Sequence, residues 1–201
     1  MSVQSLGTAR PRRTARPPLL DVAAEVLVTN PGASLAEVAE AAGIGRTTLH
    51  KHYATREDLL RAVGHRAIDL WEKALDEVTD GPDGGLRAIT AAMVAIGLQL
   101  GFVWRTPVLD GDHDLTQRWN AMEERGLAVL RRAQDRGVLA PGTPDWWLLH
   151  TFYSLIYVAA DNVSAGRLAP FDAPDLVIRT FLRGVGPPLL LPAPTPKDER
   201  A

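Results

Sequence analysis

Apolar side chains recur every three or four residues along most of the chain, a spacing that gathers them on one face of an α-helix. The residues 30–32, Asn-Pro-Gly, form a turn signal that ends a first helix. No segment alternates apolar and polar residues for long enough to predict a β-strand. The pattern therefore predicts a nearly all-α protein. Its first helix follows Pro17 and Pro18, with an apolar face made of Leu20, Ala23, Ala24, Leu27 and Val28.

A second, short helix is predicted to start at Ser34. A serine three residues before Glu37 has the spacing of a capping box, in which the hydroxyl and the carboxylate each accept a hydrogen bond from a free backbone N–H. Gly43 ends this helix because glycine readily adopts the positive φ needed at a helix terminus. The side chains expected to be buried are those of Leu35, Val38, Ala39 and Ala42.

A third short helix is predicted over residues 46–53, directly after a tight glycine turn. Leu49 and Tyr53 lie four residues apart and share one face, while the opposite face holds only polar and basic groups. Two short helices joined in this way are typical of a helix-turn-helix, whose second helix enters the major groove of DNA. The alternative is that these polar side chains are simply solvated.

The rest of the chain predicts a larger all-helical region. Its expected helices cover residues 64–78, 86–105, a stretch through Trp119 and Met122 to about 136, 145–165 and 174–184.

Residues 88–104 carry no charge and approach the length of about 20 residues that spans a bilayer. We interpret them as a core helix, because Thr90 and Gln99 interrupt the apolar run and Arg87 and Arg105 flank it directly. A membrane span is the alternative.

Composition and charge indicate the cellular compartment and the kind of partner. The chain has no cysteine, which excludes disulfides and thiolate metal sites and fits a reducing cytoplasm. The N-terminus lacks the apolar run of a secretory signal, so we expect a cytoplasmic protein. Residues 1–56 carry seven Arg or Lys and four Asp or Glu, whereas residues 57–201 carry fifteen and twenty. The basic N-terminal part predicts an anionic partner there.

Both ends of the chain predict flexible segments. Four arginines interleaved with Thr, Ala and Pro predict an extended arm that could enter a DNA minor groove: Arg10, Arg12, Arg13 and Arg16. A solubilising tail without a DNA role is the alternative for this arm. The Pro-rich residues 187–201 predict a disordered tail.

Residues 34–63, SLAEVAEAAGIGRTTLHKHYATREDLLRAV, closely resemble the DNA-binding domain of the tetracycline-repressor (TetR) family of transcriptional regulators. The family typically has Ile-Ala-x-x-Ala-Gly-Val-Ser, then Thr-Leu-Tyr-x-His-Phe, then a Lys-Glu-x-Leu-Leu segment that opens a fourth helix. The counterparts here are residues 38–45, 48–53 and 55–60. The resemblance implies an all-α fold with four parts: an arm at 1–16, a three-helix helix-turn-helix domain at 17–63, a larger helical ligand-binding and dimerisation domain at 64–186, and a tail at 187–201.

The resemblance also implies which residues contact a double-stranded DNA operator. Arg46 and Thr47 would face base edges, and Arg46 is the foremost candidate for specificity because arginine pairs bidentately with guanine. Ser34 would bind a phosphate at the start of its helix, or act only as a cap. The groove and backbone contacts would come from Thr48, His50, Lys51 and His52, with Arg56 on a phosphate at the fourth helix.

Two positions depart from the family pattern. His50 stands where the family usually has a tyrosine, so we expect DNA affinity to strengthen below about pH 6.5, where an ordinary histidine side chain gains a proton. Gly45 replaces the common Ser or Thr cap of the third helix, which removes a side-chain capping bond.

In the family, the C-terminal domain binds a small-molecule inducer, and its last two helices pair with those of a second copy. Residues 145–165 are apolar around more than one stripe, which fits such a homodimer, with burial inside a monomer as the alternative. Aromatic and methionine side chains could line an apolar ligand pocket, although core packing is the commoner role for each: Trp71, Met93, Phe102, Trp104, Trp119, Met122, Tyr153 and Tyr157.

Other classes of function have less support. No phosphate loop, nucleophile elbow or zinc-protease motif occurs, so we expect no enzyme and no cofactor. The acidic residues 110–114 lack the spacing of a metal site, and a solvated loop explains them. We therefore predict a homodimeric, ligand-responsive repressor, with a helical small-molecule-binding protein that lacks operator binding as the alternative.

Overall fold

The structure is a computed structural model that describes residues 18–185 of the 201-residue chain. Within that range it contains eight α-helices, one short 3-10 helix and no strand, as the apolar periodicity predicts. The arm at 1–16, with Arg10, Arg12, Arg13 and Arg16, and the tail at 187–201 lie outside the described residues.

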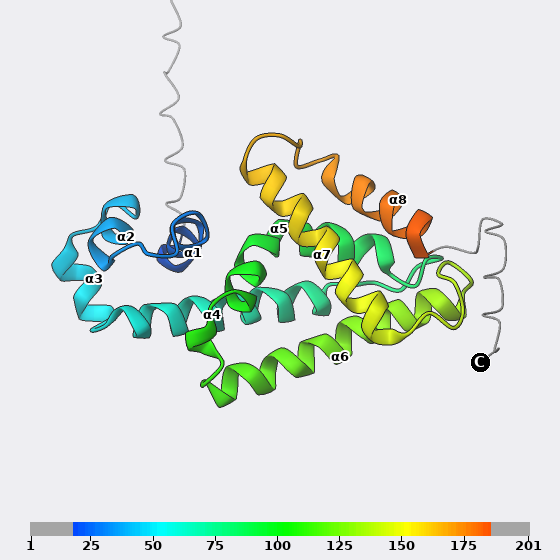
Figure 1. The fold of residues 1–201 in the computed structure, drawn as a ribbon, viewed down its shortest axis with the longest axis horizontal. Coiled ribbons are helices and arrows are strands. Elements are labelled where there is room, and N and C mark those ends of the chain that lie inside the picture. Colours follow the sequence, from blue (N-terminus) through cyan, green and yellow to red (C-terminus); the bar gives the residue numbers. More distant parts are fainter. Residues whose placement is uncertain (1–17, 186–201) are drawn as a thin grey trace, which may run out of the picture.

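Three short helices gather at one end of the molecule (Figure 1). They are α1 (Leu19–Thr29), α2 (Leu35–Ala41) and α3 (Arg46–His52). Ala23, Leu27, Val38 and Leu49 from all three helices are fully or almost fully buried. These helices therefore form one packed unit, with their polar faces left outward.

The fourth helix, α4 (Arg56–Asp76), joins this unit to the body of the molecule (Figure 1). Thr55 and Asp58 cap its start reciprocally, the Thr55 N–H lying 2.9 Å from Asp58 Oδ2. This start confirms the fourth helix that the TetR resemblance opens at residues 55–60, and the helix that apolar periodicity predicts from residue 64 is its continuation. Gly64 lies within this continuous helix, and the absence of a side chain there allows Leu109 and Leu115 to pack closely against α4. The predicted domain boundary between residues 63 and 64 falls inside this continuous helix.

The central helix is α5 (Leu86–Trp104), which packs against α1, α4, α6, α7 and α8. Among the described residues it is the one helix long and apolar enough to cross a membrane, and 56% of its apolar stretch is buried in the protein. Its place in the fold is that of a core helix. Buried side chains of the short helices, α4 and α5 belong to one contiguous apolar cluster, which crosses the predicted domain boundary.

Three further helices complete the body: α6 (His113–Asp135), α7 (Asp145–Ser164) and α8 (Ala173–Val185). The 3-10 helix Pro107–Leu109 leads from α5 towards α6. Large apolar side chains remain exposed on α7, α8 and the segment between them, namely Trp146, Trp147, Val158, Phe171 and Leu176.

Candidate DNA interface and ligand cavity

The start of α2 is built by the predicted capping box. The Ser34 N–H donates to Glu37 Oε2 at 2.7 Å, and Ser34 Oγ accepts from the Glu37 N–H at 3.3 Å. Hydrogen bonding of the Glu37 carboxyl to the Ser34 backbone N–H, and secondarily to the Ser34 side chain, lowers the pKa of that carboxyl. Ser34 is exposed, so its role as a cap leaves it accessible to a partner.

The turn between α2 and α3 depends on one glycine. Gly43 has φ 58°, in the left-handed region that side chains other than glycine seldom adopt. The Ile44 N–H then donates to the Ala39 carbonyl at 2.9 Å, which closes the end of α2. Gly45 precedes α3 without a side-chain capping bond, as its sequence predicts.

The third helix presents a polar and basic surface on a buried anchor. Leu49 is fully buried among the short helices, and Tyr53 at the end of α3 is half-buried. Every other side chain of the helix is exposed. Each of these exposed residues is a predicted DNA contact: Arg46, Thr47, Thr48, His50, Lys51 and His52. The helix is therefore anchored by the buried Leu49, and its exposed face is accessible to a partner.

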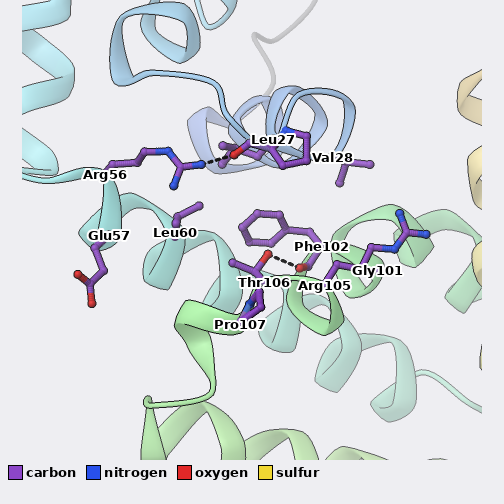
Figure 2. A pocket seen from close by; sticks show the side chains of 11 residues that line it. Leu27, Val28, Arg56, Glu57, Leu60, Gly101, Phe102, Arg105, Thr106 and Pro107 are labelled. Atoms are coloured by element: carbon purple, nitrogen blue, oxygen red, sulfur yellow. Dashed lines mark hydrogen bonds between the residues drawn. The ribbon is translucent and has the colours of Figure 1, made fainter.

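Arg56 has a structural role that its sequence position does not indicate. Its Nε donates to the Ala33 carbonyl at 3.1 Å, and its Nη2 donates to the Pro31 carbonyl (Figure 2). Because these carbonyls lie in the segment before α2, the guanidinium ties the start of α4 to the entry of the helix-turn-helix. The phosphate contact expected of Arg56 stays a prediction, and it would have to coexist with these bonds.

A cavity of about 480 Å³ lies between α1, the start of α4 and the end of α5; we call it the junction cavity (Figure 2). Leu27 of α1, Leu60 of α4 and Phe102 of α5 contribute apolar side chains to it. Phe102, expected in a ligand pocket with the other aromatic residues, therefore lies on a different side of α5. No sequence motif marks the place where α1 approaches the end of α5, so this cavity was not predicted.

Six of the eight predicted ligand residues converge on a second, smaller space, the inner cavity, of about 20 Å³. The Trp71 ring meets Trp119 and Tyr153 edge to face, with centroids 4.9 Å and 5.4 Å apart. Met122 is buried but does not line this cavity. The six lining residues are Trp71, Met93, Trp104, Trp119, Tyr153 and Tyr157.

Glycines of α5 allow α7 to approach α5 closely beside this cavity, a feature that was not predicted. A Cβ on Gly97 would lie 2.7 Å from the Ala160 Cβ, and one on Gly101 would overlap the Tyr157 ring. Both glycines line the inner cavity. Their spacing of four residues on one helical face was the available signal.

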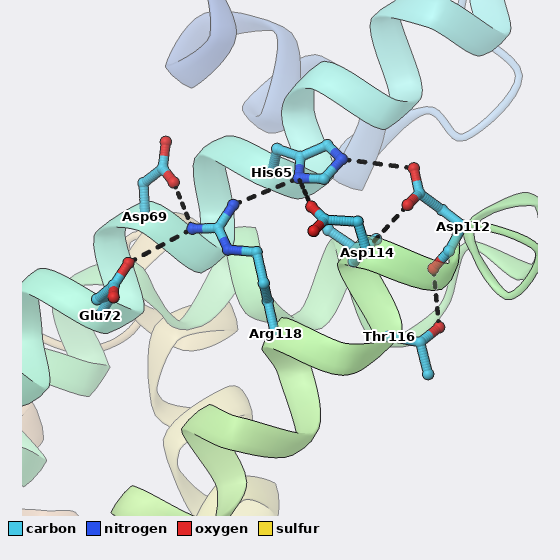
Figure 3. A network of polar contacts seen from close by, with 8 residues as sticks. His65, Asp69, Glu72, Asp112, Asp114, Thr116 and Arg118 are labelled. Atoms are coloured by element: carbon cyan, nitrogen blue, oxygen red, sulfur yellow. Dashed lines mark hydrogen bonds and ion pairs between the residues drawn. The ribbon is translucent and has the colours of Figure 1, made fainter.

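Polar contacts hold α4 against the start of α6 (Figure 3). His65 of α4 lies between two carboxylates, with Nε2 3.4 Å from Asp112 Oδ2 and Nδ1 3.6 Å from Asp114 Oδ2. Arg118 of α6 reaches back to Asp69 of α4, at 2.6 Å. Asp112 also caps α6 by accepting from the Leu115 N–H, and this hydrogen bond is the largest cause of its lowered pKa. The acidic loop thus serves as a helix cap and an interhelical contact.

Comparisons with known proteins agree with this architecture. Residues 19–63 match the family model of bacterial regulatory proteins of the tetR family. The HTH-type transcriptional repressor LfrR of Mycolicibacterium smegmatis is 32% identical over 168 residues, which cover 82% of this chain and 85% of LfrR. The chain belongs to the TetR family. As a TetR-family member, it is a DNA-binding transcriptional regulator.

Other TetR-family proteins extend the comparison. The HTH-type transcriptional regulator NfxB of Pseudomonas aeruginosa is 27% identical over 176 residues, covering 85% of this chain and 94% of NfxB. A crystal structure of LfrR in complex with proflavine has a TM-score of 0.70 at 29% identity, covering 83% of this chain and 93% of that one. PfmR of Thermus thermophilus shares the fold, with a TM-score of 0.63 at 17% identity over 82% of this chain and 97% of its own.

Proposed function

We propose that this TetR-family regulator is a homodimeric repressor that binds an inverted-repeat operator through α3. It leaves the operator when a small apolar or amphipathic molecule binds in the helical body. The observation that supports operator binding is the exposed polar face of α3, which is anchored by the fully buried Leu49. Similarity to the repressor LfrR, which was crystallised with proflavine, supports the ligand part. A regulator of this kind acts on DNA in the cytoplasm.

We assign the contacts by their chemistry. Arg46 opens α3 and reads a base edge together with Thr47, because a guanidinium can pair with guanine O6 and N7. Thr48, His50, Lys51 and His52 follow the groove and backbone, and Ser34 adds a phosphate contact at α2. Arg56 contributes mainly by holding the entry of α2. Phosphate contacts by these groups make the affinity fall steeply with salt.

The dimer is proposed to form on α7 and α8. Val158 of α7 and Leu176 of α8 are exposed apolar side chains, and a groove of about 420 Å³ runs between these two helices. Apolar surface of this kind is typical of an interface between subunits. A two-fold axis through such an interface would present two copies of α3 to successive major grooves, about 34–36 Å apart or a multiple of that.

The experiment that tests the proposal is selection of bound fragments from a genomic DNA library. Wild-type protein and an Arg46→Ala, Lys51→Ala double variant are compared at moderate salt. Enrichment of an inverted repeat by the wild type alone supports operator binding through α3. If neither protein enriches a sequence, operator binding is refuted, and the alternative of a helical small-molecule-binding protein gains support.

A further inference from the structure

The junction cavity has the size and the apolar interior of a small-molecule site. Its volume of about 480 Å³ lies within the range of about 300–1,000 Å³ that such sites occupy. The inner cavity, at about 20 Å³, holds about one water molecule. Leu27, Leu60 and Phe102 line the junction cavity and are almost fully buried. This interior suits the apolar body of a ligand.

Arg56 brings a cationic group with an unused donor to this cavity. The residue is half-buried, and its Nε and Nη2 donate to the carbonyls of Ala33 and Pro31. No described residue accepts a hydrogen bond from its Nη1, which points from the guanidinium towards Leu60 in Figure 2. A guanidinium N–H forms its strongest hydrogen bonds with carboxylates and other anions.

The other two charged residues that line the cavity have partners of their own. Glu57 is exposed and its carboxylate lies 2.6 Å from Arg61 Nη2, and Figure 2 shows it pointing away from Phe102. The Arg105 guanidinium is stacked on the Tyr157 ring of α7, 3.9 Å from its centroid. The unused charged donor at the cavity is therefore cationic, and it favours an anionic ligand group over a neutral one.

A ligand in this cavity would contact both parts of the molecule. Leu27 and Val28 belong to α1 of the helix-turn-helix unit. Phe102 of α5, with Thr106 and Pro107 directly after that helix, belongs to the body. Because the ligand would lie between the unit that presents α3 and the rest of the protein, its binding can be linked to DNA binding.

We propose that the junction cavity binds a small monocarboxylate with an apolar body, and that Arg56 Nη1 holds the carboxylate. This site is distinct from the aromatic residues of the inner cavity. Its ligand fixes α1 against the end of α5 and thereby changes the affinity for operator DNA. The binding does not depend on the proposed function, whereas the effect on operator affinity rests on it.

The first test uses cinnamate, a flat aromatic monocarboxylate, and cinnamamide, its uncharged counterpart. Calorimetric titration without DNA at neutral pH gives dissociation constants for the wild type, Arg56→Gln and Arg87→Gln. We expect cinnamate to bind the wild type about tenfold more tightly than cinnamamide, and Arg56→Gln to remove this preference. Arg87→Gln, which alters an exposed arginine of α5 that does not line the cavity, is the control and should keep the preference.

Three outcomes of this titration would overturn the proposal. Failure of cinnamate to bind the wild type would remove the site, and equal affinity for both compounds would refute the anionic ligand class. An equal loss of both compounds in Arg56→Gln would show that the guanidinium only shapes the cavity and does not hold the carboxylate.

A second variant tests the location without altering Arg56. Val28 of α1 is half-buried and lines the cavity, so the larger side chain of Val28→Phe takes up part of its volume. We expect this variant to weaken both compounds severalfold while its thermal unfolding stays cooperative. Unchanged affinity for cinnamate in Val28→Phe would place the bound compound elsewhere and overturn the proposal.

Operator DNA supplies the last readout. By thermodynamic linkage, bound operator changes the affinity for cinnamate by the same factor as cinnamate changes the affinity for operator, and we expect a factor of about five or more. Equal cinnamate affinity with and without operator would overturn the effect on DNA binding. If no operator sequence is found, the proposed function fails, whereas cinnamate binding to the free protein still decides whether the site exists.

Discussion

At the scale of single residues, neighbouring cations in the helix-turn-helix unit have different environments. Arg46 and Lys51 are exposed on α3, whereas Arg56 is half-buried and donates to backbone carbonyls before α2. A cation that already donates to the protein has fewer donors free for DNA. The first two residues should therefore dominate the electrostatic and base-reading parts of the interaction, and Arg56 should act on stability.

Substitutions on α3 should separate these two parts of DNA binding. Lys51→Ala should weaken binding to all sequences and reduce the slope of log affinity against log salt by about one, because one phosphate contact is lost. Arg46→Ala should cost about 1–3 kcal/mol and relax specificity at one base position. Fluorescence anisotropy over a salt series measures both effects. Lys73→Ala, which removes an exposed lysine of α4, should change neither the affinity nor its salt dependence. An equal loss of affinity in this variant would show a non-specific charge effect.

The Glu37 carboxylate should stabilise α2 in a pH-dependent way. Its folded-state pKa is lowered by hydrogen bonds to Ser34, so its contribution is present above the ordinary value of 4.5 and is lost as pH falls through the lowered value. Glu37→Gln should therefore reduce the free energy of unfolding at pH 7, with a difference from wild type that disappears under more acidic conditions. Urea unfolding at several pH values measures it. Glu40→Gln, on the same helix, is the control variant.

At the scale of elements, close helix contacts explain both successes and failures of the sequence analysis. The expected helix over 145–165 corresponds to α7 (Asp145–Ser164), because a long apolar run and its flanking turn signals are local information. Apolar periodicity placed a helix boundary at Gly64, yet α4 passes through it. The packing of Leu109 and Leu115 against this glycine joins residues far apart in the sequence, so local sequence does not show it. The contact of His65 with Asp112 and Asp114 was not predicted for a similar reason, because these residues lie far apart in the sequence.

The contact of α5 with α7 makes a definite prediction about Gly97. A Cβ at this position would lie 2.7 Å from the Ala160 Cβ and 3.3 Å from the Ile156 carbonyl oxygen, so the two helices would have to separate. We expect Gly97→Ala to destabilise the protein by about 1–3 kcal/mol, despite the better helix propensity of alanine. Gly184→Ala is the matched control on α8, since no atom lies within 4 Å of its Cβ position. Equal urea-unfolding midpoints for Gly97→Ala and the wild type would disprove the close contact.

At the scale of the whole molecule, one continuous helix links the two sites. The first turn of α4 holds the entry of α2 through Arg56, and its later turns carry Trp71 into the inner cavity. Between these points, α6 contacts α4 through His65 and Arg118 (Figure 3). A change at the inner cavity that shifts α6 would therefore be transmitted to the helix-turn-helix by α4. A rigid element that both sites contact can carry coupling of this kind.

Arg118 is the residue whose loss should weaken that coupling. Its Nη2 lies 2.6 Å from Asp69 Oδ1 and 3.5 Å from Glu72 Oε2 of α4, so Arg118→Ala removes the contact without touching either binding surface. Partly exposed ion pairs contribute little to stability, and the variant should fold and bind operator DNA like the wild type. The ligand should then change operator affinity less than in the wild type, where such coupling is typically about 1–3 kcal/mol.

The measurement is operator affinity with and without saturating ligand, which gives the coupling free energy directly. Arg87→Ala is the matched control, because Arg87 also forms an exposed interhelical ion pair, at 2.6 Å with Asp175 of α8, but it does not contact α4 through that pair. Undiminished coupling in Arg118→Ala would show that the signal bypasses the contact of α6 with α4. The junction cavity, where Phe102 of α5 approaches Leu27 of α1, would then be the more direct route from the pocket to the helix-turn-helix.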